Sequence, residues 1–294
     1  MNENFKSGFV SIIGKPNVGK STLINKLVGE KLSAITPKPQ TTRQQIKGII
    51  TDAEKQIVFL DTPGYVKPRY ELHQKMLSYI KDALESSDLI IFITDAKTFP
   101  TDYDKEICRE LGKTKINQIA LLNKIDLVDE KTVSEKMLLL ENYKFAKIIP
   151  VSILKNDNLK ELLDIFTSFL PYSPPHYDPE QLSDLPVRFF IQEIIMEQIF
   201  LNYQDEIPYS AAVMVESFKE QENKIDIQAN IWLERQSQKP ILLGKNGSKI
   251  KEIRLKSESE IYKILKKRIK LDLWVKIKPH WRNKKNALKE FGYR

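Results

Sequence analysis

The feature that most limits the fold is an eight-residue stretch that satisfies the pattern G-x-x-x-x-G-K-[ST]: Gly14, Lys15, Pro16, Asn17, Val18, Gly19, Lys20 and Ser21. It follows the apolar run FVSII and opens the helix-periodic segment KSTLINKLV, which includes Thr22. In such a loop, backbone N–H groups surround a polyphosphate, Lys20 neutralises the β- and γ-phosphate oxygens, and the Ser21 hydroxyl binds Mg²⁺. The sequence therefore predicts a strand, a loop and a helix that together bind a nucleotide.

Residues 9–170 alternate between short apolar runs and longer segments of helical period. The runs are FVSII, QIVFL, DLIIFIT, QIALLN and AKIIPV, and the longer segments include ELHQKMLSYIKDAL and DNLKELLDIFTSFL. Apolar runs of this length between helices are typical of buried strands. We predict an α/β domain over residues 1–170, with a mostly parallel sheet, helices on both faces and the ligand at the carboxyl ends of the strands.

The pattern changes after residue 170. Residues 171–186, PYSPPHYDPEQLSDLP, contain five prolines and no apolar period, which indicates a linker. Residues 187–294 then read as a helix, two alternating strands, a glycine-marked helical hairpin and a last strand, LDLWVKI. This order predicts a second, smaller α+β domain.

Charge is distributed unevenly between the two parts of the chain. The net charge is +8, but residues 240–294 hold 17 Lys and Arg against 5 Asp and Glu, so the rest of the chain is slightly acidic. A basic end of this kind favours a polyanionic partner. The N-terminal segment MNENFKSGF lacks the apolar core of a secretory signal, and no apolar run approaches membrane-spanning length, so we expect a cytoplasmic protein.

Two further motifs follow predicted strands. Asp61, Thr62, Pro63 and Gly64 come directly after QIVFL, where a carboxylate can hold Mg²⁺ through water and a glycine N–H can contact the terminal phosphate. Tyr65 follows them, where many GTPases carry a glutamine that orients the attacking water.

The second motif, Asn123-Lys124-Ile125-Asp126, ends the strand QIALLN. A carboxylate that accepts two N–H bonds from a base edge selects guanine, because adenine offers no such pair. We therefore predict that Asp126 reads the base, Lys124 packs over it and Asn123 ties the loops together. Ser152, which follows AKIIPV, is expected to support the base through its backbone, next to Ile153.

The ordered set GKPNVGKS, PQTTR, DTPG and NKID resembles the translation-factor-related GTPases, over about half the chain. The resemblance implies that Thr42 reaches Mg²⁺ in the GTP state, although the doublet with Thr41 leaves a one-residue ambiguity. Tyr65 places the chain beside the GTPases that lack the glutamine, which implies slow intrinsic turnover. Asn17 resembles a phosphate-loop asparagine that helps to hold K⁺ in related GTPases, and this is a further hypothesis. The fifth motif, usually S-A-[LK], is here Ser152-Ile153-Leu154.

A G-x-x-G turn lies between two helical stretches of the basic domain, as Gly244, Lys245, Asn246 and Gly247, followed by Ser248 and Lys249. Such a turn lets a nucleic-acid backbone approach the peptide backbone, as in KH domains. The turn alone is a weak signal, but the strands before it and the basic helix after it strengthen the reading.

The ending LDLWVKIKPHWR, the P-x-R-F at Pro186–Phe189 and the sequence EIPYS at Glu206–Ser210 resemble the Era family, and the similarity then covers essentially the whole chain. The family implies a GTPase domain followed by a type II KH domain, GTP or GDP with Mg²⁺ as ligands, binding of the 3′ end of small-subunit ribosomal RNA, and a role in small-subunit assembly. It also implies contact with the inner membrane face for some members, and we expect a monomer. One departure is Ile253–Glu258, IRLKSE, where the family usually has IGTEAR.

Two alternatives stay open at this stage. One is a constitutive RNA-binding protein whose nucleotide site is only structural, which a GTPase assay would separate. The other is a membrane-surface GTPase that places its basic end on anionic lipid, which predicts liposome binding.

Overall fold

The computed structural model describes residues 4–159 and 161–293, and the chain forms two compact units. The first contains residues up to 33, 42–68 and 76–184, and the second contains 34–41, 69–75 and 185–294. Two short segments from the N-terminal half therefore group with the C-terminal residues. The sequence-based limits, 1–170, 171–186 and 187–294, stay predictions about which parts fold by themselves.

The first unit is built on a six-stranded sheet in the order β2-β3-β1-β4-β5-β6. All neighbouring strands are parallel except β2, which pairs antiparallel with β3. The predicted mostly parallel sheet is confirmed. Its strands are β1 (Lys6–Ile13), β2 (Ile46–Thr51), β3 (Lys55–Asp61), β4 (Leu89–Asp95), β5 (Asn117–Asn123) and β6 (Lys147–Val151).

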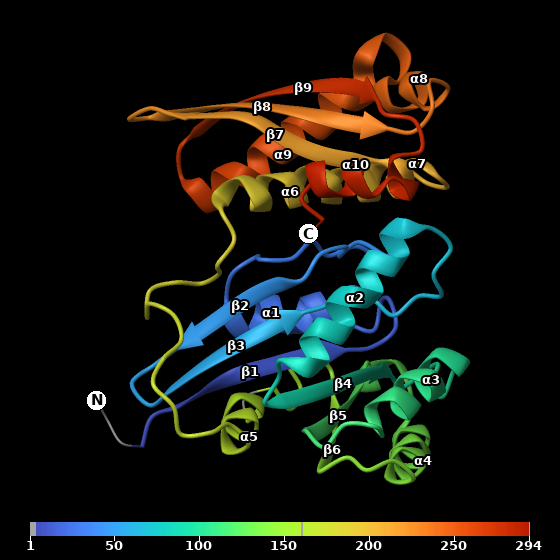
Figure 1. Cartoon of the computed structure of the whole chain (residues 1–294), viewed down its shortest axis with the longest axis vertical. Helices are drawn as coiled ribbons and strands as arrows, with labels where there is room; N and C mark the ends of the chain where they lie inside the picture. Colours follow the sequence, from blue (N-terminus) through green and yellow to red (C-terminus); the bar gives the residue numbers. More distant parts are fainter. Residues whose placement is uncertain (1–3, 160, 294) are drawn as a thin grey trace. The chain divides into compact units, whose positions relative to one another are not determined.

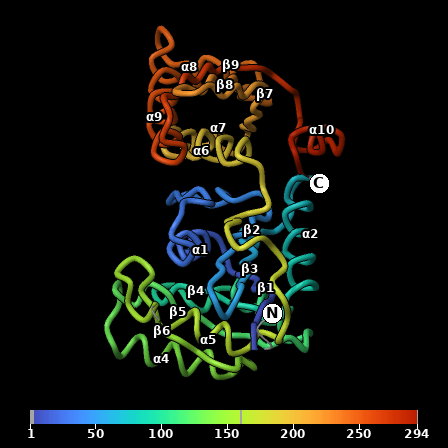
Figure 2. Tube along the Cα trace, turned by 90° about the vertical axis from the view of Figure 1, so that its left-hand side faces the viewer, coloured from blue at the N-terminus to red at the C-terminus, as the bar shows by residue number. Residues whose placement is uncertain are grey.

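Helices cover both faces of this sheet, and Figure 2 shows α1 and α2 on its opposite sides. Successive side chains of β4 point to opposite faces of the sheet, and both faces are apolar. Ile91 packs in one buried cluster with α1 and α5, whereas Phe92 packs in another with α2, α3 and α4. A strand buried on both faces has to be apolar throughout, as LIIFIT is. The helices are α1 (Lys20–Val28), α2 (Glu71–Glu85), α3 (Asp102–Leu111), α4 (Glu130–Glu141) and α5 (Leu162–Ser168).

The proline-rich segment is fastened to the first unit as far as residue 184. The buried side chain of Gln56 donates to the carbonyl of Tyr177 and accepts from the backbone N–H groups of His176 and Tyr177. The N–H of Ile49, on the edge strand β2, donates to the carbonyl of Leu182 at 2.9 Å. This segment thus lies along the outer edge of the sheet.

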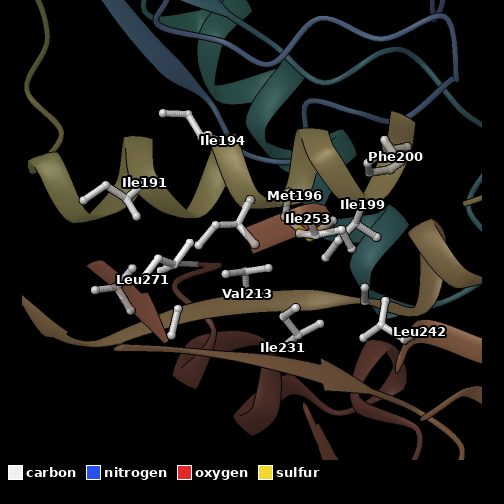
Figure 3. Packing of buried hydrophobic residues seen from close by; sticks show 14 of the residues in the cluster. Ile191, Ile194, Met196, Ile199, Phe200, Val213, Ile231, Leu242, Ile253 and Leu271 are labelled. Carbon is white, nitrogen blue, oxygen red and sulfur yellow. The ribbon is translucent and has the colours of Figure 1, made fainter. Parts of the chain in front are cut away.

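The second unit packs two long helices against one face of a three-stranded sheet, ordered β7-β8-β9, with β8 and β9 parallel (Figure 1). Figure 3 shows the packed layer, with Ile191 and Ile199 of α6 turned toward Val213 and Ile231 of the sheet. The elements are α6 (Val187–Asn202), α7 (Ile207–Ser210), β7 (Ala212–Glu220), β8 (Lys224–Leu233), α8 (Gln238–Leu243), α9 (Ser248–Leu265), β9 (Arg268–Ile277) and α10 (Lys285–Glu290).

This order of elements confirms the predicted α+β arrangement. Helix α9 runs without a break through the stretch that departs from the Era pattern, and Ile253 is fully buried in the core. The side chain of Glu258 accepts from Arg254 at 3.0 Å and from the backbone N–H of Leu271 at 2.9 Å, which ties α9 to β9. In the part of the chain that is described, no helix combines the length and apolarity that crossing a membrane requires.

Candidate functional site

The phosphate loop, residues 14–19, joins the carboxyl end of β1 to the start of α1. Gly19 has φ of 110°, which glycine tolerates without strain, and a Cβ there would lie 2.5 Å from the Asn123 amide nitrogen. A Cβ on Gly14 would lie 2.3 Å from the carbonyl oxygen of Ile93. The positive φ and the Asn123 side chain therefore require glycine at position 19, and the Ile93 backbone requires it at position 14.

Lys20 is buried, and its ammonium donates to the carbonyls of Gly14 and Lys15, both at 3.1 Å. Burial lowers the pKa of Lys20 to about 8, although the Asp61 carboxylate opposes the change. A buried cation that donates to loop carbonyls is well placed to receive an anionic ligand, because the anion would restore the solvation that burial removed.

The side chain of Lys15 is turned to a different partner. Its ammonium donates to Asp104 of α3 at 2.8 Å and to the hydroxyl of Thr98 at 2.9 Å. Asp104 is fully buried, and it also closes a capping box at the start of α3 with Thr101. The Lys15 side chain therefore anchors the loop to α3, and Lys15 can contact a phosphate through its backbone.

The three residues predicted to hold Mg²⁺ converge at the start of α1. The hydroxyls of Ser21 and Thr42 lie 2.9 Å apart, whereas the Thr41 hydroxyl turns away to Thr36 at 2.6 Å. Asp61 is fully buried, one of its oxygens accepts from Ser33 at 2.7 Å, and the other has no hydrogen-bond partner among the described residues. Burial raises the pKa of Asp61, while the Ser33 hydroxyl and Lys20 act against the shift.

This donor set fits a hydrated Mg²⁺ ion. Oxygen ligands that include one carboxylate and hydroxyls suit this hard cation, and an orphaned buried carboxylate oxygen is costly unless a cation or its water satisfies it. The geometry favours Thr42 over Thr41 in the doublet.

The segment Asp61–Gly64 lies directly against the phosphate loop. The Thr62 hydroxyl donates to the carbonyl of Ile12 at 2.8 Å, and Pro63 and Gly64 are buried. A Cβ on Gly64 would come within 2.8 to 3.0 Å of three atoms of Pro16, two of them backbone. Glycine therefore permits the close approach that brings the Gly64 N–H to the phosphate loop.

Tyr65 follows, and its backbone N–H donates to the carbonyl of Gly14 at 3.2 Å. Its phenol donates to Glu106 of α3 at 2.9 Å. Burial and this carboxylate raise the pKa of Tyr65 to about 12. The hydroxyl is held by α3 and is a neutral donor, so it does not take the role of a water-orienting glutamine.

The loop predicted to read the base is built on Asn123. The Asn123 amide donates to the carbonyl of Val18 at 2.7 Å, and its oxygen accepts from the N–H of Ile153 at 3.1 Å. One buried side chain thus joins the carboxyl ends of β5 and β6 to the phosphate loop. Ser152 contributes its side chain as well as its backbone, because its hydroxyl donates to Asp126 at 2.6 Å and orients that exposed carboxylate.

Lys124 spans the distance from this loop to Asn17. Its ammonium donates to the carbonyl of Asn17 at 2.8 Å and to Asp95, at the end of β4, at 2.6 Å. Lys124 and Asn17 both have φ of 64°, a left-handed conformation that asparagine tolerates better than most residues. Ile125 opens the short 3-10 helix Ile125–Leu127, which carries Asp126.

The second candidate site is the turn between α8 and α9. Gly244, Asn246 and Gly247 all have positive φ, at 72°, 51° and 73°, and a Cβ on Gly244 would lie 2.7 Å from the side chain of Lys249. Lys245, Asn246, Ser248 and Lys249 are exposed. The turn thus presents backbone and cations to solvent, as a nucleic-acid backbone requires.

Sequence reasoning missed three residues of the nucleotide site: Ser33, Asp95 and Asp104. Asp95 directly follows the predicted strand DLIIFIT, whose carboxyl end faces the ligand, so its position could have identified it. Asp104 stands three residues after Thr101, a spacing typical of a capping box, although that spacing does not reveal its ion pair with Lys15.

Comparison with known proteins agrees with this arrangement. Residues 9–124 match the family model described as 50S ribosome-binding GTPase, and residues 206–282 match the KH domain model. GTPase Era of Ruminiclostridium cellulolyticum is 41% identical over 99% of this chain and 98% of its own length. GTPase Era of Geotalea daltonii is 42% identical over 99% of both chains.

A solved structure of Era in complex with MgGDPNP and nucleotides 1506–1542 of 16S ribosomal RNA has a TM-score of 0.94 and 36% identity, covering 98% of this chain and 99% of that one. Because this likeness extends through both units, the chain belongs to the Era family of GTPases.

Proposed function

We propose that this protein binds GTP with Mg²⁺, hydrolyses it to GDP and phosphate, and uses the nucleotide state to control its binding to the 3′ end of small-subunit ribosomal RNA during assembly of that subunit. The observation that carries the proposal is the convergence of four loops at the carboxyl ends of β1, β3, β5 and β6. They bring together a buried lysine, an orphaned carboxylate oxygen and an oriented exposed carboxylate.

Each loop has a distinct task in this proposal. The amides of the phosphate loop and Lys20 bind the phosphates, and Asp126 accepts two N–H bonds from guanine. Ser21, Thr42 and Asp61 would hold Mg²⁺ directly or through water. The ion, when bound, neutralises charge on the β- and γ-phosphate oxygens. The Gly64 N–H senses the terminal phosphate, because the close packing on Pro16 fixes its position.

Hydrolysis without a glutamine needs another source of charge stabilisation. We infer that a potassium ion beside Asn17 supplies this stabilisation, because a positive charge fixed in the site lowers the energy of the negative charge that develops on the phosphate oxygens. Replacing Asn17 by glycine tests this, because glycine keeps the positive φ and removes the side-chain amide. We expect faster turnover in potassium than in sodium for the natural chain and no such difference for the Asn17→Gly variant. Equal turnover of the natural chain in both salts would refute the inference.

The RNA half of the proposal rests on the exposed turn and on its relatives. The solved complex of an Era protein that is 36% identical to this chain contains an rRNA fragment, and residues 206–282 of this chain match the KH domain model. By this proposal, the Gly244–Gly247 turn clamps the RNA backbone, and the groove beside α8 and α9 receives the bases.

The decisive experiment measures affinity for a 37-nucleotide RNA corresponding to that fragment, with GDP and with GDPNP in turn. We expect the two affinities to differ at least tenfold if the nucleotide state controls RNA binding. The matched variant Lys245→Asp/Asn246→Asp should weaken RNA binding in both states and leave GTP hydrolysis unchanged. Equal RNA affinity with both nucleotides would reject the coupling, and failure to bind either nucleotide in the presence of Mg²⁺ would reject the whole proposal.

We further infer cytoplasmic residence, with the membrane face as a secondary location. Vesicles that contain anionic lipid provide the test, since binding through residues 240–294 should fall as salt rises. An RNA that fails to displace the protein from vesicles would favour the membrane-surface reading over the ribosomal one.

A further inference from the structure

The strand β9 carries two different sets of side chains. Ile269, Leu271, Leu273, Val275 and Ile277 belong to the core or pack against it. The intervening residues therefore project from the opposite face of the sheet, away from the core helices. They are Arg268, Lys270, Asp272, Trp274 and Lys276, which we call the outer face of β9.

Trp274 stands out on this outer face. It is 62% exposed, whereas Leu271 is fully buried and Trp281 is 0% exposed. An exposed indole adds nothing to the core, and in soluble proteins large aromatic side chains in the open are frequently contact residues for a partner. The position is one that neither nucleotide binding nor the G-x-x-G turn employs.

Three cations share the outer face of β9 with this indole: Lys276 two residues away along the strand, Lys270 four and Arg268 six. Arg268, Lys270 and Lys276 are all exposed, and Asp272, the one acid on the outer face, is half-buried. The Lys276 ammonium lies 5.3 Å from the ring centroid of Trp232 on β8, so it stays beside the sheet surface. A flat ring among phosphate-binding charges is the combination that binds single-stranded nucleic acid, since bases stack on the ring and cations follow the backbone.

The outer face of β9 also lies at a sheet edge that borders the proposed RNA groove. β9 is an edge strand of the sheet in the described residues, and it packs against α8 and α9, the two helices that flank the Gly244–Gly247 turn. A KH turn clamps about four nucleotides, so a longer strand has to leave the groove and cross a neighbouring surface. The edge of β9 is such a surface.

A lipid surface fits this face less well. The neighbours of Trp274 across the sheet are polar, because Asn230 is its register partner and Gln228 pairs with Asp272. Trp232 of β8 lies on the same side of the sheet, but the ammonium groups of Lys276 and Lys278 lie over its ring at 5.3 and 5.7 Å from the centroid. Insertion into a bilayer interface requires several apolar side chains together, and Trp274 is the exposed one here.

We propose that Trp274 is a stacking platform for a base of single-stranded RNA that continues from the G-x-x-G groove over the outer face of β9, where Lys270 and Arg268 contact phosphates. The proposal deepens the RNA-binding function proposed above and rests on it. It adds a second contact surface to the KH unit, and this surface favours RNA that extends beyond the clamped nucleotides.

The experiment uses the full chain and a twelve-nucleotide single-stranded RNA from the 3′ end of small-subunit rRNA. Trp274→Ala should weaken binding about tenfold or more, the loss expected for one base–aromatic stack, and Trp274→Phe should restore most of it. Tyr172→Ala is the control, because Tyr172 is an aromatic side chain that is 69% exposed and lies in the first unit, and the affinity of this variant should stay within about twofold of the natural chain. Lys270→Ala should reduce the slope of log affinity against log salt by about 0.7, the value for one single-strand phosphate contact.

Fluorescence gives an independent readout. RNA should quench the emission of the natural chain, and the quenching should disappear in Trp274→Phe although the RNA still binds. If the Trp274 variants bound RNA with the affinity of the natural chain and showed undiminished quenching, the proposal would be overturned. If the Lys245→Asp/Asn246→Asp variant still lost RNA binding in that case, the proposed function would stand without it. An equal loss in Tyr172→Ala, or loss of vesicle binding instead of RNA binding in Trp274→Ala, would overturn it as well. If the natural chain binds no RNA, the proposed function itself fails.

Discussion

Replacing Asp104 by alanine tests how far the phosphate loop depends on the buried ion pair behind it. Asp104 accepts hydrogen bonds from Lys15 and the Thr94 hydroxyl, both at 2.8 Å, and from the N–H and hydroxyl of Thr101 at 2.8 and 2.7 Å. Its side chain is fully buried and that of Lys15 is 11% exposed, so solvent screens the pair little.

Removing one partner of a buried pair leaves an uncompensated charge, which costs about 3–5 kcal/mol of unfolding free energy. Loss of the capping box adds about 1 kcal/mol. Partial movement of Lys15 toward solvent offsets some of this, so we expect a loss of about 4 kcal/mol for Asp104→Ala. Asp104→Asn keeps an acceptor and should cost less.

The chain carries separate probes for its two units. Its three tryptophans, Trp232, Trp274 and Trp281, lie in the second unit, and its single cysteine, Cys108, lies in α3 of the first. Cys108 is 5% exposed and burial raises its pKa to about 12, so the folded thiol should resist alkylation. Urea titration with thiol labelling therefore reports the first unit, and tryptophan emission reports the second.

In Asp104→Ala we expect the labelling midpoint to move to much lower urea while the emission midpoint moves far less. Asp102→Ala is the control on the same helix, because its side chain is 97% exposed, and it should cost under about 1 kcal/mol. If Asp104→Ala cost no more than Asp102→Ala, the argument from the buried pair would be wrong.

Three further predictions concern single groups of the first unit. Because the pKa of the Cys108 thiol is raised in the folded chain, the unfolded chain releases this proton at lower pH than the folded chain does. The contribution of the thiol to the free energy of unfolding is therefore present below pH 9 and is lost as pH rises from 9 toward 12. Cys108→Ala should flatten that part of the curve of stability against pH, measured by circular dichroism. Asp126→Asn removes the carboxylate that Ser152 orients, so calorimetry should show GTP affinity falling roughly 100-fold, with xanthine nucleotides preferred; unchanged guanine preference contradicts the reading of the base. Gly64→Ala forces its Cβ against backbone atoms of Pro16, so the two loops must move apart and single-turnover hydrolysis should slow roughly 100-fold. A natural rate would show that the close approach is dispensable.

Much of the nucleotide site could be predicted because its residues are consecutive in the sequence. A motif such as Gly14–Ser21 fixes backbone and side chains together, and each later motif stands at the end of an apolar run that indicates a strand. The pairing of Lys15 with Asp104 could not be predicted, because it joins residues 89 positions apart and depends on where α3 packs.

Other features could not be predicted from the sequence, for different reasons. The helix α4 was not predicted, since its sequence EKTVSEKMLLLE buries only Leu140 and lacks a strong apolar face. The doublet Thr41-Thr42 is ambiguous in sequence, and only the distance to Ser21 separates the two hydroxyls. The stretch LDLWVKI was predicted to be a strand, but the sequence does not show that β9 is the edge of the sheet, so the exposure of its outer face could not be predicted.

The proline-rich segment has a consequence for how the first unit avoids self-association. β2 ends the six-stranded sheet, and an edge strand with open amides is a template on which another chain can add a strand. The Ile49 N–H on this edge donates to the carbonyl of Leu182, the hydrogen bonds of Gln56 on β3 hold the same segment beside the sheet, and proline itself cannot extend the ladder. A fragment that stopped at residue 170 would expose the β2 edge and aggregate, whereas one that continued to residue 184 would keep the segment that covers this edge.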